Sequence, residues 1–360
     1  MWFFIVLTGS SVRQIRAKIT AFLLMLAASS ASWAEIVEDL YGAVVSVPDV
    51  SQEALVVASR EALSQVLVKV SGTEAVLQAP AVVSALNESR SLVQRFAYAR
   101  EDKVGASLSA HFEFESSSIS NLIQQAQQPF WTANRPVVLA WIVVEGPAGR
   151  QFLTEESMPE LMASFSDEFG RRGLPFQMPL YDINDAAAMS PDELWSLRTV
   201  PLRDASQRYG GKDILAGRVA ILSNGDWVGD WAYLFDNSRV DRTLKIDSAK
   251  DFFQQGSALV AQQMSARFAV TSAADAISSA RVKVSGVSSY SDYARVVEWL
   301  QGLELIDSAN ISSIRGDVIR VELSARADAQ SLAATIELNN RLKALPTPGR
   351  DEELSYQWLK

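Results

Sequence analysis

The sequence predicts a multi-domain protein of the α/β (α+β mixed) class, with a central mixed-sheet α/β domain and a C-terminal ferredoxin-like βαββαβ domain. A chain of 360 residues exceeds the usual size of one hydrophobic core, so two or three domains are expected. Its 48% apolar and 21% charged residues are typical of a globular protein that buries such cores. Segments with helical and with strand periodicity alternate along the chain.

Residues 1–34 have the pattern of an export signal, which predicts cleavage after Ala34 and a periplasmic location. The apolar run 21–28 is shorter than the roughly 20 residues needed to span a bilayer, so no stable membrane insertion is expected after cleavage. A second apolar patch at 2–7 leaves open a translation start near Val12, or an uncleaved anchor. The basic region and the cleavage site are formed by Arg13, Arg16, Lys18 and by Ser32, Trp33, Ala34.

The N-terminal domain is expected at 35–128. A strand is predicted at 37–47 and a helix at 51–70, because Leu63, Val66, Leu67 and Val70 repeat at helical spacing. Residues 106–115 alternate apolar and polar side chains, which predicts a half-buried strand followed by a short helix.

The central domain is expected at 129–270, after a polar, proline-containing boundary at 127–136. Residues 137–145 are apolar on both faces, as in a central strand. A helix around Phe165 and a return strand at 175–178 would complete a βαβ unit. The sequence SPDELW predicts a helix start, with Ser190 as N-cap and Glu193 completing a capping box.

The stretch DASQRYGGKDILAGRV, residues 204–219, contains a lysine after two glycines but lacks the spacing of a phosphate-binding P-loop. We interpret it as a corner: a helix at 201–209, stopped by Gly210 and Gly211, and a strand at 213–222. An Asn-Gly hairpin turn at 223–226 would lead into a strand at 227–235. A further strand at 240–246 and a helix at 248–268 would close this domain.

The C-terminal domain is expected at 280–360, after a small, polar linker at 270–280. Strands are predicted at 281–287, 305–314, 318–323 and 354–359, and helices at 291–303 and 328–339. This order is βαββαβ, the ferredoxin-like arrangement.

Several segments together resemble the bacterial envelope family DUF2066, a domain of unknown function. The segments are KVSG from Lys69, QRFAY from Gln94, FWTANRPVVLAW from Phe130, RRGLPFQMPLYD from Arg171, ASQRYGGKDILAGRV from Ala205 and GDWVGDWAY from Gly225. The resemblance implies an exported gammaproteobacterial protein. It implies no catalytic activity.

The chain lacks the residues that many common catalytic mechanisms require. The chain has no cysteine, and its one histidine, His111, lies on the polar face of its predicted strand, so no metal site and no cofactor is expected. Removing residues 1–34 takes away three of 33 basic and none of 42 acidic residues, leaving a formal charge of −12 that disfavours nucleic acid. The remaining enzymatic alternative is an exported carboxylate-dependent hydrolase that would use Asp182, Asp185 or Asp204.

Aromatic and arginine side chains near domain junctions are the candidates for a binding surface, with core packing as the competing interpretation. Trp227 and Trp231 would share one face of their strand. The leading hypothesis is a soluble periplasmic, non-enzymatic binding or envelope-assembly module whose partner is another envelope protein or a small ligand. The candidate residues are Trp131, Arg135, Arg208, Tyr209, Trp227 and Trp231.

Overall fold

The computed structural model describes residues 34–37, 39–100, 108–222, 226–270, 278–338, 341–346 and 353–359. Three separate hydrophobic regions, each built on a sheet of three or more strands, confirm the mixed α/β, multi-domain class. The domain boundaries at 35–128, 129–270 and 280–360 stay a prediction. The export signal before Ala34, the turn at 223–225 and most of the linker at 270–280 lie outside the described residues.

The N-terminal sheet has the strand order β2 (Gly42–Ser46), β4 (Leu108–Phe114), β3 (Val93–Arg100). The long helix α2 (Gln52–Ser71) packs against it, as predicted; Ser51 caps its start, and Gly72, with φ of +75°, ends it. The strand predicted at 37–47 begins only at β2, because a turn occupies residues 39–41. The smaller helices are η1 (Glu74–Gln78), α3 (Pro80–Asn87), α4 (Ser89–Leu92) and α5 (Ser116–Gln125).

The central sheet has the order β11-β10-β9-β6-β7, with β8 also pairing with β6. Strands β6, β8 and β9 run parallel, as the predicted βαβ unit requires, and the outer pairs are antiparallel hairpins. The strands are β6 (Val138–Gly146), β7 (Gly149–Phe152), β8 (Phe176–Gln177), β9 (Asp213–Ile221), β10 (Trp227–Phe235) and β11 (Ser238–Ile246).

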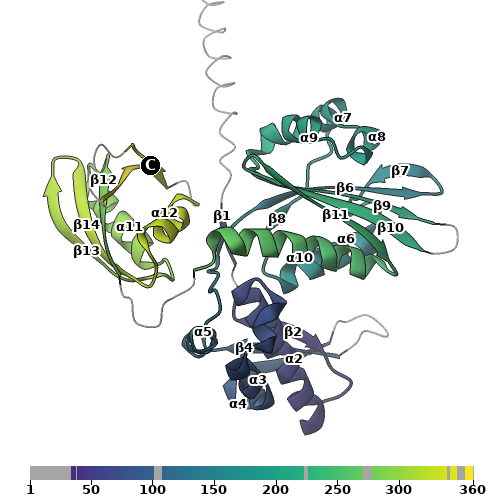
Figure 1. Ribbon diagram of the computed structural model, residues 1–360, viewed down its shortest axis with the longest axis horizontal. Helices are drawn as coiled ribbons and strands as arrows, with labels where there is room; N and C mark the ends of the chain where they lie inside the picture. The colour runs from purple at the N-terminus through teal and green to yellow at the C-terminus, as the bar shows by residue number, and fades with distance from the viewer. Residues whose placement is uncertain are drawn as a thin grey trace, which may run out of the picture.

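Helices cover both faces of the central sheet (Figure 1). On one face lie α6 (Pro159–Arg171) and α10 (Ala249–Phe268), and on the other α7 (Ile183–Ala188), α8 (Pro191–Trp195) and α9 (Thr199–Ser206). Ser190 caps α8 by accepting the Glu193 N–H at 3.1 Å, as predicted, but the Glu193 carboxylate binds Arg198 rather than completing the predicted capping box. After the short turn η2 (Gln207–Tyr209), Gly210 takes a φ of +63° and β9 begins at Asp213, which confirms the corner.

The C-terminal sheet has the order β13-β14-β12-β16-β15, and helices α11 (Tyr290–Gln301) and α12 (Ala329–Glu337) contribute to its core. The predicted βαββαβ order is present. The additional strand β15 reverses the chain before β16, so β16 pairs parallel with β12. The strands are β12 (Ser278–Ser285), β13 (Ile306–Arg315), β14 (Val318–Ala325), β15 (Leu342–Ala344) and β16 (Glu353–Trp358).

Residues 130–136 connect these regions, and we call them the junction segment. Its strand β5 (Asn134–Pro136) pairs with β1 (Ala34–Ile36), and Phe130 bridges to Val270. In the described part of the chain, no helix has the length and apolar character needed to cross a bilayer.

Candidate functional site

Two of the predicted binding residues, Trp131 and Arg135, are completely buried in the junction segment. The Arg135 guanidinium lies 3.7 Å from the centre of the Trp131 ring. It donates hydrogen bonds of 2.8–3.1 Å to five backbone carbonyls, those of Lys69, Trp131, Thr132, Arg172 and Gly173. Arg135 therefore joins the N-terminal helix α2 to the central domain, and its donors face protein rather than a ligand.

Burial gives this junction unusual electrostatics. It lowers the pKa of Arg135 to about 9 and that of Lys69 to about 8. The Lys69 ammonium donates to the carbonyls of Asp39 and Gly42, at 2.9 and 2.8 Å. The C-terminal domain supplies Glu304, whose carboxylate accepts from the Tyr41 hydroxyl at 3.0 Å and from the Ala133 N–H at 2.9 Å.

Arg208 and Tyr209 lie together at the end of η2, where they bind two of the three acids considered for hydrolysis. Arg208 donates to Asp182 at 2.6 and 2.9 Å and to Asp185 at 2.9 Å, and Tyr209 donates to Asp185. The Arg208 hydrogen bonds lower the pKa of Asp182, while burial and Asp185 raise the pKa of Tyr209 to about 12. Asp182 also caps α7. These hydrogen bonds hold the start of α7 against η2.

Trp227 and Trp231 face the same side of β10, as predicted, but that side is the core beneath α10. Trp231 is fully buried, stacks on Phe252 with ring centres 4.3 Å apart, and donates its indole N–H to the Phe252 carbonyl at 3.0 Å. Trp227 is partly buried at the edge of the same core. The core interpretation describes both positions.

The other acid and the histidine are also placed. Asp204 accepts a hydrogen bond from the Gln207 side chain at 3.3 Å, whereas Asp182 and Asp185 both bind Arg208. His111 lies on the polar face of β4, with Nε2 3.4 Å from an Asp39 oxygen. Among the described residues, no three His, Cys, Asp or Glu side chains form a group that could hold a metal ion.

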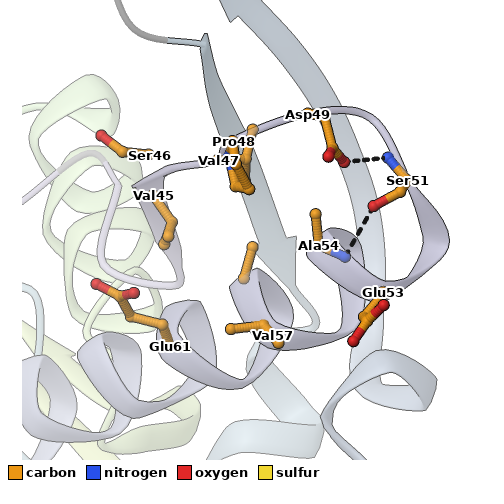
Figure 2. A pocket seen from close by; sticks show the side chains of 11 residues that line it. Val45, Ser46, Val47, Pro48, Asp49, Ser51, Glu53, Ala54, Val57 and Glu61 are labelled. Carbon is orange, nitrogen blue, oxygen red and sulfur yellow. Dashed lines mark hydrogen bonds between the residues drawn. The ribbon is translucent and has the colours of Figure 1, made fainter.

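A different site lies between β2 and the first half of α2, and we call it the β2–α2 hollow (Figure 2). It is open to solvent and has a volume of about 280 Å³. Val57, which lines it, is 64% exposed. The lining residues are Val45, Ser46, Val47, Pro48, Asp49, Ser51, Glu53, Ala54, Val57, Ala58 and Glu61.

The backbone of β2 presents unpaired hydrogen-bonding groups beside this hollow. Tyr41 O accepts from Phe114 N and Val47 N donates to Leu108 O, so odd-numbered residues of this segment direct their backbone groups toward β4. Alternation then directs the N–H and C=O of Val44 and Ser46 to the opposite edge, where no described strand pairs with them.

Both ends of this free edge are defined. At Gly42 the outward carbonyl is already bound by the Lys69 ammonium, and its N–H bonds to Asp39 O. At the other end Pro48 has no N–H to donate. The available edge is therefore short, limited to Val44 and Ser46.

All charged residues that line the β2–α2 hollow are acidic: Asp49, Glu53 and Glu61. Hydrogen bonds from Ser51 lower the pKa of Asp49, so this carboxylate is ionised at neutral pH. The Ser51 hydroxyl in turn accepts the Ala54 N–H at 3.2 Å and caps α2. The start of α2 was predicted from the sequence, but the hollow was not, because neither the free edge of β2 nor its distance from α2 has a sequence signal.

Residues 34–132 match a family described as a domain of unknown function, DUF8605. The resemblance to DUF2066 is therefore wrong: the matching family is a different one and covers only the N-terminal part of the chain. No curated protein and no solved structure matches this chain. The matched region contains the whole β2–α2 hollow and ends inside the junction segment.

Proposed function

We propose that this protein is an exported, non-enzymatic binding module that holds an extended segment of another envelope protein in the β2–α2 hollow. The observation that carries the proposal is the free edge at Val44 and Ser46 beside an open, partly apolar hollow. A free strand edge next to a helix is a recurring site for peptide binding by strand addition.

The size of the site fits this mode of binding. The two outward residues provide four backbone groups, and each hydrogen bond contributes on the order of 1 kcal/mol after desolvation. The hollow is smaller and more open than the enclosed pockets of several hundred Å³ that hold small ligands. The open shape therefore fits an extended peptide lying along the strand better than a small molecule, which needs an enclosed pocket.

Carboxylate-dependent hydrolysis has less support. Asp182 and Asp185 both bind Arg208, which holds them in a structural cluster. In the β2–α2 hollow, Glu53 and Glu61 are eight residues apart on α2, which corresponds to roughly 12 Å along the helix axis. The paired carboxyls of glycoside hydrolases are closer, at roughly 5 to 10 Å.

Export and a periplasmic location are part of the proposal. They are supported by the basic region, apolar run and small-residue cleavage site of residues 1–34. The family match begins at residue 34, where the expected leader ends. N-terminal sequencing of the protein from a periplasmic fraction should give Glu35 as the first residue; a full-length product in the cytosol would contradict export.

Strand addition is tested at Ser46, because its N–H points outward while the β2–β4 ladder uses its neighbours. Ser46→Pro removes this donor, and edge strands tolerate proline at such positions. Ser46→Ala keeps the donor and is the matched control. A photo-crosslinking amino acid at Val44 should give adducts with a defined partner in the intact envelope, and the same group at Val83, exposed on α3, should not.

We expect Ser46→Pro to abolish the Val44 adducts and Ser46→Ala to leave them. Circular dichroism checks that both variants are folded. Adducts that persist in folded Ser46→Pro would overturn strand addition at this edge.

A further inference from the structure

We infer that the β2–α2 hollow selects an extended segment with a basic side chain at position i, an apolar one at i+2 and a second basic one at i+4. This inference rests on the proposed strand addition and adds the chemistry of the bound segment. It is drawn from three of the five α2 residues that line the hollow, Glu53, Val57 and Glu61.

These three side chains follow each other at intervals of four residues along α2. Neighbours at this interval lie on one side of a helix and are separated by about 6 Å along its axis. Alternate residues of an extended strand point to one face and are separated by about 6.6 Å. Three alternate side chains of a bound strand can therefore meet the acid, the valine and the second acid in turn.

The orientation of the two elements permits this match. Figure 2 shows Ser46, Val45 and Glu61 at one end of the hollow, Val57 in the middle, and Asp49, Ser51 and Glu53 at the other end. The β2 segment and the first half of α2 thus run along the hollow in opposite directions. A strand added to β2 would lie along α2, with one set of its side chains facing the helix.

The acidic residues that line the hollow determine which charge the bound segment can carry. Asp49, Glu53 and Glu61 line the hollow, and no lysine or arginine is among the lining residues. The positive end of the α2 dipole would favour an anion, but the Ser51 hydroxyl and the Asp49 carboxylate already occupy backbone N–H groups there. An acidic segment or a terminal carboxylate is therefore disfavoured, and lysine or arginine side chains are favoured.

The experiment measures binding of two fluorescent, end-capped synthetic peptides to the purified protein by anisotropy, at low ionic strength. One peptide has lysine, valine and lysine at alternate positions separated by threonine; the other has glutamate in place of both lysines. We expect the lysine peptide to bind at least about tenfold more tightly, and added salt to reduce this preference.

The double variant Glu53→Lys/Glu61→Lys should reverse the preference, while Glu298→Lys, an exposed acid on α11, should leave it unchanged. If both peptides bind equally and Ser46→Pro abolishes both, the charge selection is wrong and strand addition stands. If neither peptide binds, or if binding is unaffected by Ser46→Pro while Ser46→Pro remains folded, strand addition fails together with this inference.

Discussion

Arg135 shows how one side chain can determine a domain junction. Its five hydrogen bonds to carbonyls use the planar, forked guanidinium, which a lysine ammonium cannot reproduce. Arg135→Lys should therefore lower the free energy of unfolding by about 3 kcal/mol, the usual cost of breaking a buried charged contact. Urea unfolding measures this; Arg60→Lys, exposed on α2, should change stability by less than about 0.5 kcal/mol. Equal effects of the two changes would contradict the junction role.

The same residue shows a limit of sequence reasoning. Aromatic and arginine residues near a domain boundary fit both a binding surface and a buried junction, and both interpretations were open for Arg135 from the sequence. Its partners include the carbonyls of Lys69 and Gly173, which are 66 and 38 residues away. Only the fold brings these carbonyls together. By contrast, the Ser190 cap and the Gly210 corner depend on a few consecutive residues, and both were predicted correctly.

At the scale of elements, α10 lies close to β10 because two glycines leave room for Trp231. A Cβ at Gly256 of α10 would lie 2.6 Å from the Trp231 ring, and one at Gly217 of β9 would lie 2.3 Å from it. Gly256→Ala should therefore destabilise the protein by about 1–3 kcal/mol through overpacking, despite the better helix propensity of alanine.

Gly170 of α6 is the matched control. A Cβ there would meet nothing within 4 Å, so Gly170→Ala should stabilise the protein by about 0.5 kcal/mol. Thermal or urea unfolding of both variants measures the difference. A stabilising Gly256→Ala would show that α10 can move away from Trp231 at little cost.

The helices and strands were predicted more completely from the sequence than the candidate site was. Helix α2, the central strands and the βαββαβ order follow from periodicity and caps, which are local. The β2–α2 hollow depends on which edge of β2 pairs with β4, and on the parity of that pairing. Shifting the register by one residue would turn the backbone groups of Val44 and Ser46 toward β4 and place those of Ala43 and Val45 at the free edge instead. No pattern in residues 42–46 specifies this choice.

At the scale of the whole molecule, Glu304 provides an acidic contact between the C-terminal domain and the junction segment. Its carboxylate accepts from Tyr41 and from Ala133 N, and the nearby Asn134 side chain donates to Thr335 O at 3.2 Å. An apolar group formed by Phe130, Val270, Leu305 and Ala327 accompanies these contacts. These contacts hold the C-terminal domain against the junction segment.

Removing the carboxylate should release that domain. Because the chain has no cysteine, spin labels on Arg60→Cys and Arg295→Cys, both exposed, report one distance between α2 and α11. We expect a narrow distance distribution with Glu304 intact and a broad one with Glu304→Ala, since Tyr41 and Ala133 lose their acceptor. Glu298→Ala, on the same domain but away from these contacts, should keep it narrow. A narrow distribution in Glu304→Ala would mean that the apolar group alone fixes the domain, and that Glu304 contributes little to the arrangement.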